Sequence, residues 1–295
     1  MLEVVSQHVA LTGQVIEDVT YEELGPQQYR VSIRGVNKTA HYKRGGFFAF
    51  SDLAPGDYTL LITGERFQTE QYALTLPLNP TFLRQPGDND AVVKVKTINA
   101  GNNHVSFDPV ILPKEIRAGA LVIGQQFSAT LAATLSAGEV TSARLSTVDA
   151  LAQGDFLRFV RDSSIRLRFD PYYLLPAGFT RIVGQVTLGG APEIALAGAE
   201  VRLSRVNDTP VATLQLGDAE FATVRLDGAD MVLGAVKDTR TLTNARGDYN
   251  LYFSDRINFQ SVTLEVTLAA YQAALGTRPV STGRRNRIDV ALARA

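Results

Sequence analysis

The chain has 295 residues, which is long enough for two ordinary domains that each bury a core of their own. Its formal net charge of -1 gives no overall field that would attract nucleic acid or an anionic membrane. The absence of cysteine excludes disulfides, cysteine-ligated zinc, iron–sulfur clusters and thiol catalysis.

The N-terminal segment MLEVVSQHVALTG does not resemble a secretory signal peptide, because it lacks a basic stretch and carries Glu3 early. No apolar run approaches the ~20 residues that a membrane-spanning helix requires. We therefore expect a cytoplasmic protein without membrane insertion, alone or as part of a particle.

The first third of the chain alternates apolar and polar residues in the manner of short β-strands. Phe48 and Phe50 share one face of a strand, and Leu60 and Ile62 share one face of the next. Pro55-Gly56 lies between these two strands, which predicts a type II turn and hence a β-hairpin.

Further alternating segments lie on both sides of this predicted hairpin. They are VALTGQV from Val9, YRVSI from Tyr29, VVKVKT from Val92 and HVSFDPVIL from His104. Many short strands separated by frequent turn signals are typical of a β-sandwich. We expect the first sandwich to span residues 1–112.

The same order of motifs recurs in the last third of the chain. LTGQVIED from Leu11 resembles IVGQVTLG from Ile182, and each is followed by a strand, a glycine and alternating aromatics. An internal duplication explains this recurrence, so we expect a second sandwich over residues 179–295. The second copy carries an insertion at about residues 206–240, in which PVATLQL and FATVRLDG predict an added hairpin.

The middle segment, residues 113–178, matches neither copy. ALVIG and SIRLRFD read as strands, QFSATLAATL reads as a strand or a helix, and Gln153-Gly154-Asp155 predicts a turn. The segment is too apolar for a flexible linker, so we expect a β-rich connector module.

Glycines and core residues recur at a fixed spacing in the first copy: Gly46-x-Phe48-x-Phe50-x-x-Leu53-x-x-Gly56-x-Tyr58-x-Leu60. Gly13-Gln14-Val15 precedes them, and the second copy has Gly184-Gln185-Val186 and Gly247-x-Tyr249-x-Leu251. These motifs resemble the carboxypeptidase regulatory-like domain family, with a transthyretin-like (prealbumin-like) sandwich. The second copy departs at the turn, where Ser254-Asp255-Arg256 replaces the Leu-x-Pro-Gly pattern. The resemblance implies an all-β protein of two such sandwiches joined by the middle module, and it implies no activity.

No motif predicts catalysis or a cofactor. The three histidines, His8, His41 and His104, have no metal-ligand spacing, and neither a nucleophile elbow nor a phosphate-binding glycine loop occurs. Asp88, Asn89 and Asp90 offer oxygen ligands for calcium, but without EF-hand spacing a polar loop is the simpler interpretation. We expect no enzymatic activity, no cofactor and no metal.

One segment mixes arginines with aromatics, RFVRDSSIRLRF from Arg158 to Phe169. Nucleic-acid binding and the outer face of a sandwich strand are two explanations, and the near-zero net charge disfavours the first. A third explanation is that the arginines meet acidic residues of a protein partner. The candidate interface comprises Arg158, Arg161, Arg166, Arg168, Tyr172 and Tyr173.

These features predict a non-enzymatic structural or adaptor protein with protein partners, of which a homo-oligomer is one form. The architecture resembles accessory proteins of phage-tail-like contractile injection particles, and we expect a component of such a particle. The alternative is a surface-displayed sandwich that binds carbohydrate or peptide through its loops. An enzyme with a regulatory sandwich ranks third, because the middle segment is short for a catalytic domain.

Overall fold

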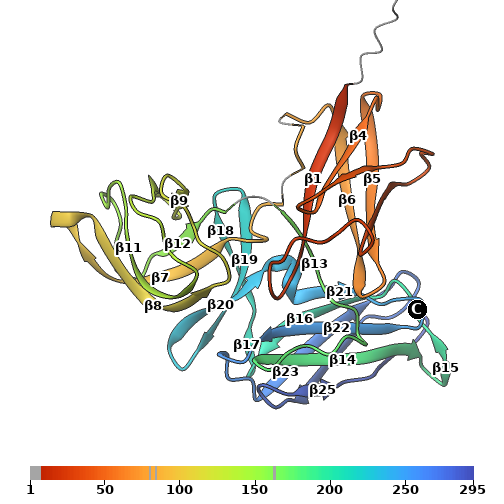
Figure 1. Ribbon diagram of the computed structural model, residues 1–295. Helices are drawn as coiled ribbons and strands as arrows, with labels where there is room; N and C mark the ends of the chain where they lie inside the picture. Colours follow the sequence, from red (N-terminus) through yellow and green to blue (C-terminus); the bar gives the residue numbers. More distant parts are fainter. Residues whose placement is uncertain (1–7, 80, 84, 162–163) are drawn as a thin grey trace, which may run out of the picture. The chain divides into compact units, whose positions relative to one another are not determined.

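The computed structural model describes residues 8–295 except residues 80, 84 and 162–163. The regular secondary structure of the described residues consists of β-strands and two short 3-10 helices, at Ala100–Asn102 and Val236–Thr239, which confirms the all-β prediction. The chain forms two compact units, residues 1–169 and 170–295, and each is described by itself (Figure 1). No described helix is long and apolar enough to cross a membrane.

The first unit contains a β-sandwich of two sheets, ordered β13-β1-β4-β3 and β2-β5-β6. The strands of the first sheet are β1 (Val9–Glu17), β3 (His41–Lys43), β4 (Phe47–Ser51) and β13 (Ile165–Leu167). Those of the second are β2 (Arg30–Ile33), β5 (Gly56–Gly64) and β6 (Phe67–Leu76). The predicted inward faces are buried, including Phe48 and Phe50 of β4 and Leu60 and Ile62 of β5.

The predicted hairpin between β4 and β5 is wrong. β4 pairs with β1 and β3, whereas β5 pairs with β2 and β6, so the chain crosses from one sheet to the other. Asp52 takes the left-handed conformation at φ 55°, and Gly56 opens β5 at φ 154°. The apolar faces of two strands meet across a core as well as side by side, and alternation alone does not separate the two arrangements.

The predicted boundary at residue 112 also differs from the observed pairing. β7 (Ala91–Asn99) and β8 (His104–Leu112) belong to a six-stranded sheet with order β10-β9-β12-β7-β8-β11. The strand that completes the first sandwich is instead β13, which pairs in parallel with β1. The six-stranded module is therefore inserted into the first sandwich, before its last strand.

The ends of the six-stranded sheet meet, which gives it the character of a small barrel. Its other strands are β9 (Leu121–Ile123), β10 (Ser128–Thr130), β11 (Gly138–Arg144) and β12 (Phe156–Phe159). Ala132 N donates to Arg144 O and Ser146 N to Thr130 O, both at 2.8 Å, which joins the two edges. QFSATLAATL is extended rather than helical, and a buried apolar cluster fills the module.

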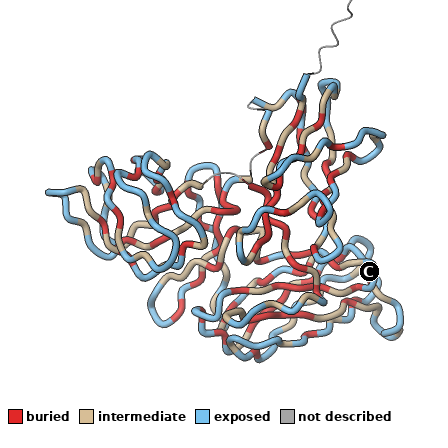
Figure 2. Tube along the Cα trace, in the orientation of Figure 1, coloured by how far each residue is buried: buried red, intermediate tan, exposed pale blue. Residues whose placement is uncertain are grey.

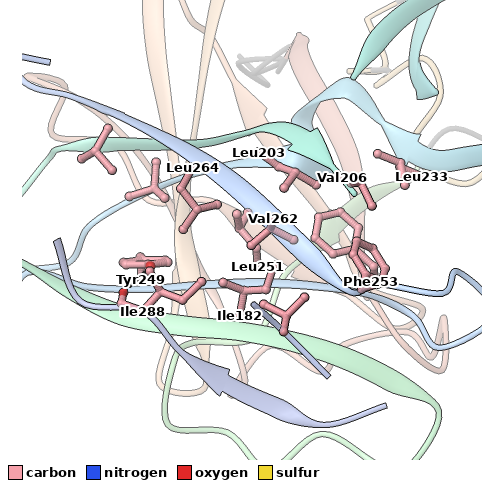
Figure 3. Close-up of a cluster of buried hydrophobic side chains, with 14 of the residues drawn as sticks. Ile182, Leu203, Val206, Leu233, Tyr249, Leu251, Phe253, Val262, Leu264 and Ile288 are labelled. Carbon is pink, nitrogen blue, oxygen red and sulfur yellow. Dashed lines mark hydrogen bonds between the residues drawn. The ribbon is translucent and has the colours of Figure 1, made fainter. Parts of the chain in front are cut away.

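The second unit contains the second sandwich. One sheet has β14 (Phe179–Leu188) at its centre, with β22 (Asp248–Ser254), β15 (Ala191–Ala195), β25 (Arg285–Arg287) and β26 (Val290–Leu292). The other has β16 (Glu200–Val206), β17 (Thr209–Pro210), β21 (Arg240–Leu242), β23 (Ser261–Thr267) and β24 (Ala274–Pro279). Figure 3 shows side chains of both sheets interlocking, among them Ile182, Leu203, Leu251 and Val262.

The insertion in the second copy forms a three-stranded sheet rather than one hairpin. It consists of β18 (Ala212–Leu216), β19 (Ala219–Leu226) and β20 (Ala229–Ala235), all antiparallel. Val224, Leu226 and Leu233 of this sheet join the apolar core of the second sandwich. The insertion thus extends the hydrophobic core instead of forming a separate loop.

The two sandwiches share one pairing scheme. β1 lies between antiparallel β4 and parallel β13, as β14 lies between antiparallel β22 and parallel β25 and β26. Gly13 faces Phe48 and Gly184 faces Tyr249 in the antiparallel pairs. Each glycine leaves room for an aromatic ring on the facing strand. An origin by duplication stays a prediction.

Along both copies the buried segments follow the strands, and the turns are mostly exposed (Figure 2).

Candidate functional site

Arg158, the first residue of the candidate interface, lies in β12 and is only 2% exposed. Its Nε lies 2.5 Å from Oδ2 of Asp90. Asp90 also accepts hydrogen bonds from the backbone N–H of Arg161 at 2.8 Å and of Gly87 at 3.1 Å. One buried carboxylate therefore joins β12, the segment that follows it and the loop before β7.

Arg166 and Arg168 make the same kind of pair with other carboxylates of this chain. Arg166 Nη1 lies 2.7 Å from Asp18 Oδ1, and both side chains are buried. Arg168 Nε lies 3.1 Å from Glu70 Oε1, and both side chains are about as well shielded. The acidic partners that we expected on another protein thus lie on this chain. Arg158 and Arg166 are buried within this chain and do not lie on its surface.

The location of these arginines follows from the alternation of β13. Ile165, Leu167 and Phe169 point into the first sandwich, so Arg166 and Arg168 fall on the opposite face. That face is also covered, and a buried guanidinium without a counter-charge would cost several kcal/mol. Pairing with carboxylates offsets this cost, and each pair fixes β13 against a different segment.

Two half-buried tyrosines border this polar cluster. The ring of Tyr21 lies 5.7 Å from the guanidinium of Arg161 and 5.9 Å from that of Arg166, within cation–π range. Burial, and then the negative charges of Glu70 and Asp88, raise the pKa of the Tyr72 hydroxyl well above its ordinary value. The cluster holds strands together and presents no activated nucleophile.

The loop considered for calcium, residues 86–91, belongs to this cluster. Asp88 and Asn89 are buried, Asp88 Oδ2 accepts from the backbone N–H of Arg166, and Asn89 Nδ2 donates to Ser164 O. The guanidinium of Arg158 already neutralises Asp90. Within the described residues, no group of three or more histidine, aspartate or glutamate side chains is placed to hold a metal. The simpler interpretation, a structural polar loop, describes this geometry.

Tyr172 and Tyr173 belong to the second unit, whereas the four arginines belong to the first. Tyr172 is 57% exposed; its hydroxyl donates to the Asp248 carboxylate, and its ring lies 5.9 Å from the Arg246 guanidinium. The hydrogen bond to Asp248 raises the pKa of Tyr172. Tyr173 is half-buried, and its carbonyl accepts from Arg181. Of the six candidate residues, Tyr172 is the one most open to solvent.

The sequence analysis did not identify Arg181 as a key polar residue. It lies in β14, is 5% exposed, and donates from Nε to Asn250 Oδ1 at 3.0 Å. Its Nη2 donates to Pro171 O at 2.5 Å and to Asp170 O at 3.3 Å. Burial, and then Arg285, lower its pKa. Its position in the sequence could have indicated this role, because Arg181 directly precedes the apolar Ile182 and Val183 of a predicted buried strand.

A hollow on the surface of the first sandwich spans the β5–β6 pair. It is lined by Asp57, Tyr58, Thr59, Ala73, Leu74 and Thr75. Thr75 Oγ1 donates to Asp57 Oδ1 at 2.6 Å, so the carboxylate is held by its neighbour across the strands. This hollow has no convergent set of acid, base and nucleophile.

No protein-family model matches the chain, and no curated protein matches it. Among solved structures, the chain is similar to the Bacillus anthracis TIE protein, at 11% identity and a TM-score of 0.24. That match covers 96% of this chain and spans 50% of that protein's length.

Two pilins are also similar. Shaft pilin SpaA from Lactobacillus rhamnosus GG matches at 9% identity and TM-score 0.28, over 70% of this chain and 98% of the pilin. BcpA, the major pilin subunit of Bacillus cereus, matches at 8% identity and TM-score 0.27, over 97% of this chain and 99% of the pilin. TM-scores this low do not assign a function.

Proposed function

We propose that the chain is a non-catalytic structural protein built from β-sandwiches, which acts through contacts with other proteins in a larger assembly. The observation that carries this proposal is the use of the buried charges. Asp90 pairs with Arg158 of β12, Asp18 with Arg166 of β13, and Glu70 with Arg168 directly after β13. These charges cross-link strands, whereas catalytic groups converge on an accessible site.

Tyr172 supplies the contact residue of this proposal. Its exposed ring is held in place by Asp248 and Arg246, which lowers the conformational entropy lost when a partner covers it. Tyrosine and arginine are enriched among the residues that dominate binding at protein interfaces. The transthyretin-like form of the sandwiches belongs to the same proposal.

Two settings suit such a protein, a phage-tail-like contractile injection particle and display on a cell surface. None of the solved structures named above is described as a component of such a particle, and no described residue favours that setting. We therefore give precedence to the surface-displayed module, with peptide or carbohydrate ligands at its loops. The cytoplasmic location remains an untested prediction.

The test measures assembly size and accessibility in cells that produce the protein. Size-exclusion chromatography with light scattering on native extract should show a species well above the chain mass of 32.0 kDa. A membrane-impermeant biotin reagent should label the protein on intact cells if it is displayed. Labelling only after lysis, with co-sedimentation in sheath-and-tube particles, would support the particle setting. A free monomer in every fraction would contradict the structural proposal.

A further inference from the structure

Two peptide bonds of this chain join aspartate to proline, within the identical tripeptides Phe107-Asp108-Pro109 and Phe169-Asp170-Pro171. Such a bond is chemically weak in mild acid. The aspartate carboxylate reaches its own carbonyl carbon through a five-membered ring, and the tertiary amide nitrogen of proline departs more readily than a secondary one. The second of these bonds lies next to the boundary between the two compact units, since the second unit begins at Asp170.

The carbonyl oxygen of Asp170 receives two side-chain donors. Arg181 Nη2 lies 3.3 Å from it, and Asn250 Nδ2 lies 3.4 Å from it. Both donors are buried on neighbouring strands, β14 and β22, and Arg181 Nε also donates to Asn250 Oδ1 at 3.0 Å. The two donors are therefore fixed in position before any charge develops on that oxygen, which is the arrangement of an oxyanion hole.

The carboxylate of Asp170 is held beside the same bond. Its Oδ1 accepts from the backbone N–H of Tyr172 at 2.8 Å and of Tyr173 at 3.0 Å. These two hydrogen bonds fix the position of the carboxylate that acts as the nucleophile. The nucleophile, the carbonyl carbon and the oxyanion donors are thus brought together within a few residues of the second unit.

We propose that Asp170–Pro171 is a site of autolytic backbone cleavage, favoured in mild acid. A carboxylate oxygen of Asp170 attacks the carbonyl carbon of Asp170, and the carbonyl oxygen takes the negative charge towards Arg181 and Asn250. The carbon–nitrogen bond then breaks, its electron pair goes to the Pro171 nitrogen, and that nitrogen takes a proton from solvent. The resulting cyclic anhydride is hydrolysed by water, so residue 170 ends as a C-terminal aspartate. No oxidant or reductant takes part.

Asp108–Pro109 serves as an internal control. It lies in β8, and the Asp108 carboxylate pairs with Lys96 at the exposed surface. In the part of the chain that the structure describes, no side chain donates to the Asp108 carbonyl oxygen. The two bonds share their local sequence on the N-terminal side, so a difference in rate reports the folded environment.

The experiment follows fragments of the full-length chain by intact-mass spectrometry. The folded protein is held at about pH 4, near the ordinary aspartate pKa, with circular dichroism as the check on folding. We expect a fragment that begins at Pro171 to form at least about tenfold faster than one that begins at Pro109, since one preorganised donor is typically worth about 10²–10³ in rate. In guanidinium chloride, the two rates should converge. Equal rates in the folded protein, or no faster cleavage at Pro171 than in the unfolded chain, would overturn the proposal.

Variants separate the groups in this mechanism. Asp170→Asn keeps an acceptor for the two N–H groups and removes the carboxylate, so cleavage at Pro171 should stop. Arg181→Lys keeps the charge and an N–H donor but loses the planar geometry, so the rate should fall about tenfold, less than the 10²–10³ of a donor lost altogether. Asp108→Asn is the matched control and should leave the rate at Pro171 unchanged. If Arg181→Lys unfolds the protein, the ratio of folded to unfolded rates in the unsubstituted chain decides the question.

Discussion

In both sandwiches, the glutamine that follows the glycine of β1 or β14 hydrogen-bonds to the loop before the antiparallel partner strand, β4 or β22. Gln14 Nε2 donates to Gly45 O, and Gln185 Nε2 donates to Arg246 O, each at 2.8 Å. The valine after each glutamine also makes the same hydrogen bond in both sandwiches. Val15 N donates to Gly46 O, and Val186 N donates to Gly247 O. The glycine–glutamine–valine motif therefore has a structural meaning that is the same in both units.

The sandwiches differ where each receives its last strand. Gln68 N donates to Arg168 O in the first, and Gln272 N donates to Ala293 O in the second, so Arg168 and Ala293 are equivalent. By the same register, Ala291 stands where Arg166 stands, and Ala274 stands where Glu70 stands. The buried ion pairs thus occur in the first sandwich alone of the two, among the residues described.

This difference coincides with the inserted barrel. β26 follows β25 directly along β14, whereas β13 has three residues and returns only after the six-stranded module. A three-residue strand makes few backbone hydrogen bonds, so its register is weakly specified by the ladder alone. We interpret Arg166 in β13 and Arg168 directly after it as the groups that fix the register of this strand.

The largest expected effect comes from breaking the buried ion pair of the inserted module, between Asp90 and Arg158 of β12. Asp90→Ala leaves the guanidinium of Arg158 buried without a counter-charge and removes the acceptor of Arg161 N and Gly87 N. We expect the free energy of unfolding of the first unit to fall by about 3–5 kcal/mol. Hydrogen exchange of peptides from β7 and β12 measures the loss.

Glu115→Ala is the matched control for that change. It breaks the pair with Arg117, in which both side chains are exposed, and should cost less than about 1 kcal/mol. Equal losses for the two variants would show that the Asp90 pair contributes no more than a surface pair.

The second prediction concerns the paired glycines. A Cβ on Gly184 would overlap the backbone carbonyl of Ile288, whereas a Cβ on Gly13 would lie 2.5 Å from the tip of the Phe48 ring. A ring moves more easily than a strand, so Gly184→Ala should destabilise its sandwich by about 3 kcal/mol and Gly13→Ala by about 1–2 kcal/mol. Denaturant unfolding of the two variants gives the order, and a larger loss for Gly13→Ala would contradict the reason given.

The sequence correctly predicted which side of each of these strands is buried, but not which strands pair with each other. Phe48, Phe50, Leu60 and Ile62 are buried as their alternation indicates, because alternation records which side of a strand meets a core. It does not record which strand lies alongside, so β4 and β5 were paired wrongly.

The candidate site shows the same limit at longer range. Arg166 lies 148 residues from Asp18, and Arg168 lies 98 residues from Glu70. No local pattern encodes partners at such separations, and an arginine that alternates with core residues matches a solvent face equally well. Acidic residues of a protein partner were one of three explanations for these arginines, and none of the three placed the carboxylates on this chain.

The third prediction uses the buried tyrosines. Burial raises the pKa of Tyr29, Tyr72 and Tyr249 above the ordinary value, so the folded state holds their protons more tightly than the unfolded state does. Stability is therefore complete below about pH 10 and falls as the pH rises further, by about 1.4 kcal/mol per pH unit for each such group. The first unit contains two of these three tyrosines and should lose stability more steeply.

Alkaline unfolding followed by circular dichroism measures this slope. Tyr249→Phe removes the titrating group of the second sandwich together with its hydrogen bond to Ile288 O at 2.5 Å. The variant should be less stable at neutral pH by about 1 kcal/mol, yet show a flatter decline above about pH 10. An unchanged decline in the second unit would mean that Tyr249 does not titrate with unfolding.

The smallest effect is expected from copying the charged pair into the second sandwich. Ala293→Arg with Ala274→Glu places an arginine and a glutamate at the positions that Arg168 and Glu70 occupy in the first. Ala293 is exposed and Ala274 is half-buried, so the new pair should contribute no more than about 1 kcal/mol. Denaturant unfolding of the double variant and of each single variant isolates the coupling between the two side chains. A coupling as large as the loss in Asp90→Ala would show that the pair itself, rather than its burial beside an inserted module, distinguishes the two sandwiches.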